Sequence, residues 1–589
     1  MADILTAEQQ AAVENRGRSL LVSAAAGSGK TKVLVERLFS YVESGEANLD
    51  DFLIITYTRA AAAELRGKIA RALTERMERD PGNEHLRRQM LRVYRADIKT
   101  VDAFCTALLR ENCHLLGEDA RGHTLRPDFR VLDENDAQAL RERVLARTLD
   151  DFYDRLTPGG ALLADTLGAG RDDSALEALV LELHAKLQAQ PYEDKWLDAQ
   201  RALWSEVPDR IEKTPYGRIL LDEVRRKARH WQRLMQTAAQ EMTQNDALNQ
   251  KYAPAFLDIS YQLEALTAKA DEGWDAARGV SIAFPRLAPV KDSDGGKLKM
   301  RMKALWDGCK AAVKGFGELL NASSGEAAED LRTMAPAMLA LIDLTAEFSR
   351  RYNEEKRRRN AADFSDQEHE AIRLLIGEDG TPTELARTVS TRYREIMVDE
   401  YQDTNEVQNR IFDAISCKGE NLFTVGDVKQ SIYRFRLADP RIFLQHYNTW
   451  PPLAQAGEHE SAKLLLSRNF RSRKEVLEAT NFIFTNVLSA EMGELDYGED
   501  EMLRPGANYV PSDRCGAEFH LLDVPVQAGG QRVRASEAEA AFAADYIHDM
   551  LTSKFPVQDE KTRELRPVRE EDIVILMRSP STRLLDYRR

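Results

Sequence analysis

One short segment restricts the fold of this chain more than any other. Residues 24–31 read Ala-Ala-Ala-Gly-Ser-Gly-Lys-Thr, a phosphate-loop pattern in which Ala24 stands at the position of the usual first glycine. Residues 19–23 before it are typical of a buried strand, and residues 31–41 have the periodicity of a helix. Such a loop lies at a helix N-terminus, where backbone N–H groups bind phosphate. The segment therefore predicts an α/β fold with a parallel sheet and a triphosphate site.

Two residues at the end of this loop have the chemistry to bind a nucleoside triphosphate and its Mg²⁺ ion. Lys30 would bridge the β- and γ-phosphates, and the hydroxyl of Thr31 would hold the metal. The residues expected to surround the phosphates are Ala24, Ala25, Ala26, Gly27, Ser28, Gly29, Lys30, Thr31 and Lys32.

More than three hundred residues later, a second apolar strand ends in two adjacent carboxylates. Residues 396–398 are followed by Asp399 and Glu400. Asp399 suits the magnesium shell, directly or through water, and Glu400 suits the base that orients and deprotonates the attacking water. Most Asp-Glu pairs are only solvated surface residues. A pair at a strand end, in a chain that also has a phosphate loop, instead indicates triphosphate hydrolysis.

Composition limits the class of protein. The chain has 589 residues, enough for three or four domains, and 43% of them are apolar. We identify no stretch long and apolar enough to span a bilayer and no signal sequence, so we expect a cytoplasmic protein without a membrane partner. Five scattered cysteines without C-x-x-C spacing indicate neither a disulfide framework nor a zinc site.

The charge distribution bears on nucleic acid binding. A formal charge of −15 argues against it for the surface as a whole, since phosphate contacts need positive potential. Basic clusters at residues 350–351, 356–359 and 468–474 offset this locally. We interpret the clusters near residue 350 as a solvated helix face and favour nucleic acid contact for residues 468–474.

Predicted elements divide the chain into three regions. Residues 1–125 and 390–450 alternate strands with helices, as in one parallel sheet. Residues 126–389 are rich in Ala, Leu, Glu and Arg with helical periodicity, which predicts an all-helical insertion. Residues 451–589 alternate again, so we expect the first part of a second α/β domain. The expected strands are 20–23, 52–56, 98–100, 396–399, 422–426, 463–467, 518–524 and 572–577.

Further motifs stand in a defined order along the chain. Gln9 precedes the phosphate loop and offers an amide that can pair with both the donor and the acceptor edge of adenine. The other segments are 56–65, 100–105, 425–436 and 469–472. Any one of them is a weak signal, but together with the phosphate loop and the acidic pair, in this order, they are a strong one.

This series resembles the UvrD-like branch of superfamily 1 DNA helicases. In that family ATP binds between two RecA-like domains, single-stranded DNA lies across them, and a helical subdomain interrupts the first. Residues 24–37, 363–366 and 425–440 are more narrowly similar to the AddA proteins of bacterial AddAB helicase–nucleases. The resemblance implies a 3′ to 5′ DNA motor in double-strand-break repair by homologous recombination. The partners that it implies are DNA ends and an AddB-like subunit.

The resemblance assigns roles in ATP turnover to matching positions. Phe470 would stack on the adenine that Gln9 reads, although relatives often have Tyr there. Arg471 would reach the γ-phosphate and neutralise charge on the transferred group. Gln402 and Gln430 would sense the γ-phosphate and couple its loss to domain movement. ATP and Mg²⁺ are the cofactors that it implies, with Lys30, Asp399, Glu400, Gln430 and Arg471 as catalytic residues.

For DNA, the resemblance implicates three aromatic residues and a threonine: Tyr57, Thr100, Tyr433 and Phe435. Aromatic rings stack on any base, which suits a motor that does not read sequence. Aromatic residues that follow strands are also common in protein cores, so a structural role is the alternative. Asp102 stands where many relatives have histidine.

The family pattern continues beyond residue 589, with the rest of the second RecA-like domain and a C-terminal nuclease. We therefore expect a partial chain; by itself it would bind ATP with little hydrolysis or unwinding. One alternative is a plain UvrD-type repair helicase without nuclease. Another is a helicase-like scaffold that binds DNA without turning over ATP. A scaffold has no need of the set Lys30, Thr31, Asp399, Glu400, Gln430 and Arg471.

Overall fold

The contacts within the chain define two compact units. The computed structural model describes residues 5–118, 122–167, 174–416, 419–512, 514–524, 534–559 and 562–588. Unit 1 comprises Met1–Gly117, Arg126–Asp128 and Phe364–Arg589, and unit 2 comprises Glu118–Leu125 and Phe129–Asp363. Residues 364–389, expected in the helical insertion, instead belong to unit 1, because helix α16 (Phe364–Leu375) packs against two helices of that unit, α5 (Val101–Asn112) and α18 (Glu406–Ile415).

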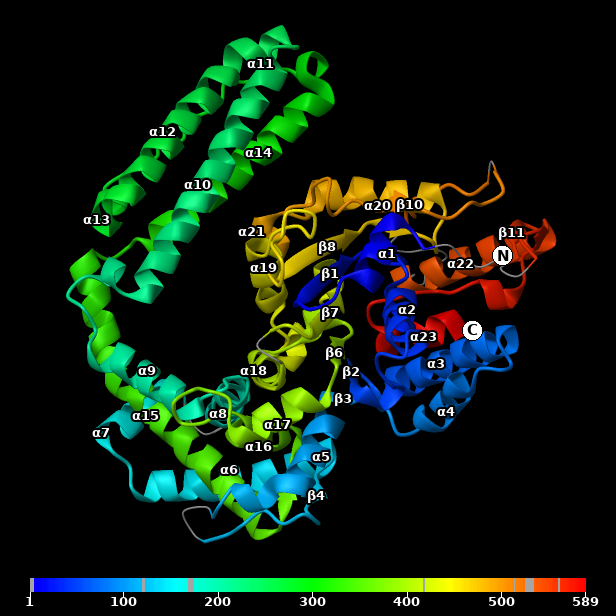
Figure 1. Ribbon diagram of the computed structural model, residues 1–589. Helices are drawn as coiled ribbons and strands as arrows, with labels where there is room; N and C mark the ends of the chain where they lie inside the picture. The colour runs from blue at the N-terminus through cyan, green and yellow to red at the C-terminus, as the bar shows by residue number, and fades with distance from the viewer. Residues whose placement is uncertain are drawn as a thin grey trace. The chain divides into compact units, whose positions relative to one another are not determined.

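Unit 1 is built on a six-stranded sheet in the order β3-β2-β6-β7-β1-β8, with all neighbouring strands parallel (Figure 1). The strands are β1 (Leu20–Ala24), β2 (Phe52–Thr56), β3 (Asp97–Thr100), β6 (Glu395–Val398), β7 (Leu422–Gly426) and β8 (Ala462–Leu466). Their apolar runs are buried because helices cover parallel sheets on both faces. β6 and β7, which follow unit 2 in the sequence, lie between β2 and β1.

The predicted strand at residues 463–467 exists, but its predicted place in a second sheet is wrong. β8 pairs with β1, from Leu20 opposite Ala462 to Ala24 opposite Leu466, and forms the edge of the first sheet. The prediction failed because the period of a strand says nothing about which strand it pairs with.

The strands predicted at residues 518–524 and 572–577 are absent from the described part of the chain. A strand needs hydrogen bonds to the backbone of a neighbour, and neither segment is paired with another strand among the described residues. Their apolar side chains are exposed instead: Leu521 is 85% exposed and Leu576 is 90% exposed. A short antiparallel hairpin of β11 (Pro556–Gln558) and β12 (Leu565–Pro567) forms between them in the sequence.

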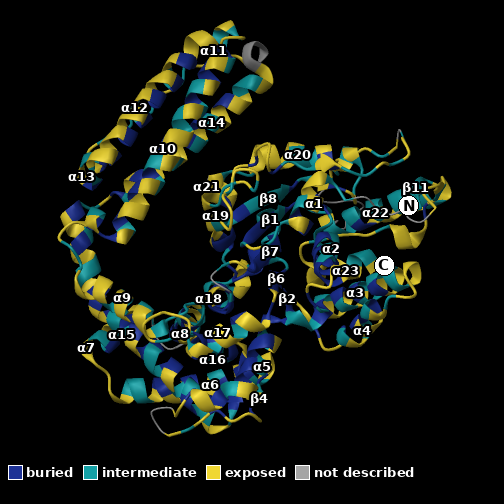
Figure 2. Ribbon diagram, viewed as in Figure 1, coloured by how far each residue is buried: buried dark blue, intermediate teal, exposed yellow. Residues whose placement is uncertain are grey.

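Helices α2 (Lys30–Glu43) and α3 (Arg59–Arg79) bury apolar faces against the sheet. Leu38 and Phe39 of α2 and Ile69 of α3 share one core with the strands. Figure 2 colours the ribbons of both units by burial, with buried residues in dark blue. The other helices of unit 1 are α1 (Ala7–Glu14), α4 (Glu84–Arg92), α5, α16, α17 (Glu384–Arg392), α18, α19 (Pro440–Thr449), α20 (Lys474–Val487), α21 (Ala490–Gly493), α22 (Ala535–Thr552) and α23 (Pro580–Arg588).

Unit 2 is almost entirely helical, in agreement with the predicted insertion of helices. Its apolar cores form where long helices pack side by side, above all α10 with α12. The helices are α6 (Glu134–Asp154), α7 (Pro158–Leu167), α8 (Ser174–Gln188), α9 (Glu193–Ser205), α10 (Pro215–Met242), α11 (Asp246–Lys251), α12 (Ala253–Glu272), α13 (Trp274–Arg278), α14 (Asp292–Leu319) and α15 (Ser324–Arg358). Within the described ranges of both units, no helix has the length and apolarity needed to cross a membrane.

Candidate active site

The phosphate loop connects β1 to α2 and has the backbone that its glycines predict. Gly27 and Gly29 have φ values of +68° and +83°, a region that other residues rarely adopt. A Cβ on Gly27 would lie 2.7 Å from Asn469 Nδ2 and 2.9 Å from Arg471 Cβ. Glycine is thus needed both for the turn and for the close approach of the segment that follows β8.

That segment, residues 469–471, is hydrogen-bonded to the phosphate loop. Asn469 Nδ2 donates to the carbonyl oxygen of Ala26 at 2.6 Å. The backbone N–H of Phe470 donates to the carbonyl oxygen of Gly27 at 2.9 Å. The structure therefore brings Phe470 and Arg471 beside the loop from a distant part of the sequence. Asn469, a residue that the motif assignments left without a role, makes the contact.

Lys30 and Glu400 meet at the centre of the site. Lys30 Nζ donates to Glu400 Oε2 at 2.8 Å, and Gln402 Nε2 donates to the same oxygen at 3.0 Å. Glu400 has a left-handed backbone, with φ of 51°, at the turn that follows β6. Such strain in a residue other than glycine is typical of functional sites.

Asp399 lies next to this ion pair and is partly buried. Burial, followed by the negative charge of Glu400, raises the pKa of Asp399 to about 6. The same two causes raise the pKa of Asp403 to about 6. These carboxyl groups share a negative local environment that a cation would relieve.

The donor set fits Mg²⁺. Thr31 and Asp399 offer the hard oxygen ligands that this ion prefers. Among the residues that the structure describes, no cluster of three or more His, Cys, Asp or Glu side chains could hold a metal. Mg²⁺ does not need such a cluster, since it is usually bound by one or two protein oxygens together with substrate phosphates and water.

Gln402 and Gln430 are linked through a third residue, Asp427. Gln402 Oε1 accepts a hydrogen bond from the backbone N–H of Asp427 at 2.9 Å, and Gln430 Nε2 donates to Asp427 Oδ2 at 2.8 Å. A Cβ on Gly426 would lie only 2.5 Å from Gln402 Oε1, so this approach depends on glycine. Sequence reasoning missed Asp427, although an acidic residue directly after a buried strand is the same signal that identified Asp399.

Gln9 lies at the start of α1 and against the phosphate loop. Its side-chain Nε2 donates to the carbonyl oxygen of Ser28 at 2.9 Å, and its Oε1 accepts from the backbone N–H of Thr6 at 3.0 Å. The second contact belongs to a capping box that begins the helix.

The predicted DNA-binding aromatic residues form a ladder. The rings of Tyr57 and Tyr433 are stacked with centroids 5.2 Å apart, and Phe435 lies 5.9 Å from Tyr433. The Arg436 guanidinium lies over both Tyr433 and Phe435, at 5.0 and 5.7 Å from the ring centroids. Phe435 is 77% exposed, so the outer end of the ladder is open to solvent.

Thr100 differs from these residues. It is buried, and its hydroxyl accepts a hydrogen bond from the backbone N–H of Ala103 at 3.3 Å, which caps the N-terminus of α5. This contact accounts for a threonine at this position without a ligand.

Glu368 of α16 is a buried acid. Burial, and then the charge of Asp102, raises the pKa of Glu368 to about 7. Its carboxyl oxygens accept hydrogen bonds from Gln408 Nε2 at 2.7 Å and from Asn405 Nδ2 at 3.4 Å. Glu368 thus ties α16 to the N-terminus of α18, a few residues after the acidic motif.

Glu368→Gln should remove a pH dependence of stability. The folded protein holds the Glu368 proton up to about pH 7, whereas the unfolded chain releases it near pH 4.5, so stability contributed by this group is lost as pH rises between these values. We expect the variant to unfold with a free energy roughly 2–3 kcal/mol higher than the unaltered protein at pH 8, and equal to it near pH 4.5. Urea titrations at several pH values measure this; parallel curves would contradict it.

The chain matches one protein family and many curated relatives. The family described as UvrD/REP helicase N-terminal domain matches residues 5–451. The A subunit of the ATP-dependent helicase/nuclease of Ruminiclostridium cellulolyticum is 34% identical over 98% of this chain and 49% of its own length. That of Bacillus licheniformis is 32% identical over 98% of this chain and 47% of its own length. The chain spans about half the length of the curated relatives it matches. On the extent of the family match, the chain belongs to the UvrD/REP helicase family.

Proposed function

We propose that the intact protein hydrolyses ATP to move 3′ to 5′ along single-stranded DNA, as the motor of an AddAB-type helicase–nuclease in double-strand-break repair. The observation that carries this proposal is the connection through Gln402 and Asp427. It joins the Lys30–Glu400 pair to the loop that bears the aromatic ladder. A protein that only bound nucleotide would have no use for this link.

Each step of ATP hydrolysis has a candidate residue in or beside the phosphate loop or at the end of β6. The phosphate loop and Lys30 bind the phosphates, while Arg471 approaches the γ-phosphate from the segment beside the loop. Mg²⁺, held by Thr31 and Asp399, would supply charge neutralisation on the phosphates. Glu400 orients the attacking water and accepts its proton.

Coupling to DNA follows from the contacts of the two glutamine amides. Gln402 and Gln430 both hydrogen-bond to Asp427, so an amide that turns toward the γ-phosphate must loosen its contact there. Tyr433 and Phe435 lie a few residues beyond Gln430 in the same loop. Loss of the γ-phosphate would thereby shift the rings on which bases stack.

The partners are proposed from the relatives, which are named as the A subunits of helicase/nucleases. We extend this to a complex with an AddB-like subunit that acts on DNA ends. Co-purification of the intact protein with such a partner tests the complex; a monomer that unwinds DNA ends at full rate would instead indicate a plain UvrD-type helicase.

The motor assignment is tested by the dependence of hydrolysis on DNA. We expect phosphate release by the intact protein to be slow without DNA and strongly stimulated by single-stranded oligonucleotides. Equal rates with and without DNA would defeat the assignment, and an absence of nucleotide binding would defeat the ATP site itself.

Phe435→Ala should weaken DNA binding selectively. Loss of one stacking ring costs about 1–3 kcal/mol, which is roughly a five- to 150-fold loss of affinity for single-stranded DNA. ATP affinity in the absence of DNA should not change. Fluorescence anisotropy with a labelled oligonucleotide measures the first quantity, and a fluorescent ATP analogue measures the second.

Tyr94→Ala is the matched control, since Tyr94 is an aromatic residue with the same exposed fraction of 77% and lies in the loop between α4 and β3. This variant should bind DNA normally. Equal losses of DNA affinity in the two variants would show that the aromatic ladder is not part of the DNA-binding site.

A further inference from the structure

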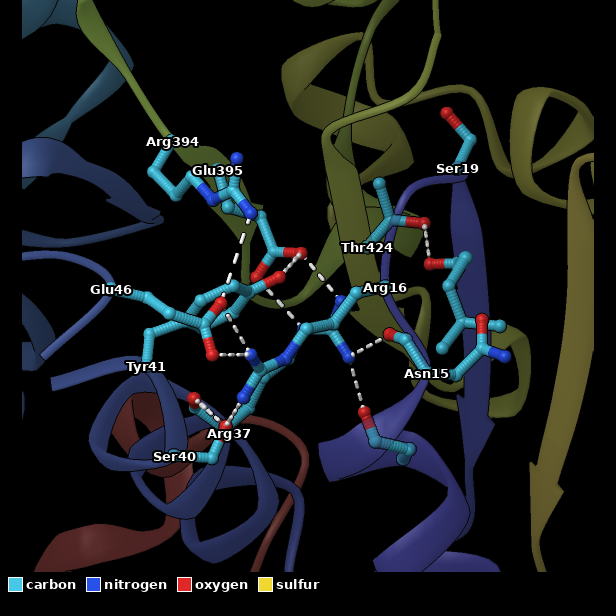
Figure 3. Close-up of polar contacts among 12 residues, drawn as sticks. Asn15, Arg16, Ser19, Arg37, Ser40, Tyr41, Glu46, Arg394, Glu395 and Thr424 are labelled. Carbon is cyan, nitrogen blue, oxygen red and sulfur yellow. Dashed lines mark hydrogen bonds and ion pairs between the residues drawn. The ribbon is translucent and has the colours of Figure 1, made fainter. Parts of the chain in front are cut away.

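Arg37 of α2 is a fully buried arginine that contacts two other elements, β6 and the end of α1 (Figure 3). Its Nε donates to Glu395 Oε2 at 2.8 Å, and its Nη2 pairs with the other carboxylate oxygen of Glu395, at the start of β6. Its Nη1 donates to the carbonyl oxygens of Ala12 at 2.5 Å and Asn15 at 2.6 Å. The guanidinium group thereby attaches the end of α1 to the sheet.

The two carbonyl contacts cap the C-terminus of α1. The last carbonyl groups of a helix have no partner within the helix, and a cation there also interacts favourably with the helix dipole. α1 is only eight residues long and buries only Gln9, Ala12 and Val13. A helix with so little buried surface depends on contacts at its ends for a fixed position.

The opposite end of α1 reaches the phosphate loop. Gln9 is one turn before Ala12, and its side chain donates to the carbonyl oxygen of Ser28. The helix is therefore held at one end by Arg37 and meets the nucleotide site at the other. A shift of α1 along or about its axis would carry the Gln9 amide with it.

We propose that Arg37 is a positioning residue for nucleobase recognition, because its cap on α1 fixes Gln9 where the amide can meet adenine. This inference rests on the proposed function and on the role that the helicase resemblance assigns to Gln9, which is to bind the adenine of ATP. Glu395 orients the guanidinium by the bidentate pair, and Tyr41 donates to the same carboxylate at 3.3 Å. Lysine cannot replace Arg37 here, since a single ammonium cannot span a carboxylate and two carbonyl groups.

The ratio of ATP to GTP affinity in the intact protein tests this, measured by equilibrium titration with fluorescent nucleotides. Removing Arg37 alone leaves a buried carboxylate unpaired, so the first variant is the double substitution Arg37→Met/Glu395→Gln. We expect its preference for ATP over GTP to fall about tenfold, toward that of Gln9→Ala. Arg37→Lys, which keeps the positive charge, should lose most of the same preference.

Arg76→Met is the matched control. Arg76 of α3 also pairs with α2, through Glu36 and Glu43, and its remaining hydrogen bond among the described residues is to Ala72 of its own helix, not to α1. The Arg76→Met variant should keep the preference for ATP over GTP even if it is less stable than the unaltered protein.

The outcomes separate the two proposals. An unaltered protein that binds ATP and GTP equally would overturn adenine recognition by Gln9, and the role of Arg37 with it. If the unaltered protein prefers ATP and a folded Arg37 variant, double or Arg37→Lys, keeps that preference, only the role of Arg37 is overturned. Circular dichroism identifies the folded variants.

Discussion

Lys30→Ala should abolish DNA-stimulated ATP hydrolysis by the intact protein. Lys30 is the first residue of α2, and its ammonium group donates a hydrogen bond to Glu400. Within residues 24–31, all of which the structure describes, it is the one side chain that carries a positive charge to where charge develops on the β- and γ-phosphates. We expect phosphate release at saturating single-stranded DNA to fall at least about a hundredfold.

Loss of the ion pair itself should not unfold the protein. The Lys30 side chain is 13% exposed and that of Glu400 is 38% exposed, so removing the pair should cost no more than about 1 kcal/mol of stability. Lys186→Ala, which removes an exposed lysine paired with Glu182 on α8, controls for loss of charge and should hydrolyse ATP normally. Hydrolysis within twofold of normal in Lys30→Ala would show that ATP reacts elsewhere.

Glu400→Gln should stop hydrolysis while preserving, or strengthening, ATP binding. The amide keeps the shape of the side chain but cannot accept the proton of the attacking water, which costs roughly 10²–10⁴-fold in rate. The negative oxygen that now holds Lys30 is also removed, so the lysine is released for the phosphates. The two variants should therefore differ in their affinity for ATP: Lys30→Ala weakens ATP binding, whereas Glu400→Gln preserves or strengthens it.

Single-turnover phosphate release and direct ATP titration separate the two effects. Glu406→Gln is the control, since Glu406 pairs with Arg410 on the exposed side of α18. A Glu400→Gln protein that loses binding and hydrolysis to the same degree would show a structural role for Glu400 in place of a chemical one.

Strands such as β1 and β6 could be predicted because each combines an apolar run with a candidate site residue after its end. β1 precedes the phosphate loop, and β6 precedes Asp399. The sequence pattern failed where pairing decides the outcome, as for β8 and for residues 572–577. Periodicity reports which side chains are buried, whereas strand order depends on contacts between distant segments.

The same limit applies to the site. The sequence predicts that Lys30 and Glu400 act together, and Lys30 Nζ lies 2.8 Å from Glu400 Oε2. Arg37 and Glu395 were not identified, because they are separated by 358 positions and each resembles an ordinary surface charge when read alone. Only the fold reveals that both are buried and paired.

The strand order has a consequence for how the protein is made. β1 and β2 are neighbours in the sequence but are separated in the sheet by β6 and β7, which leave the ribosome after the whole of unit 2. At about 5–20 residues per second, β2 must wait on the order of 20 to 70 s for its neighbour β6. During that time two apolar strands have no common partner, while the helices of unit 2 can fold through local contacts. We therefore expect the phosphate loop, although it lies near the beginning of the sequence, to be among the last parts to become ordered during translation.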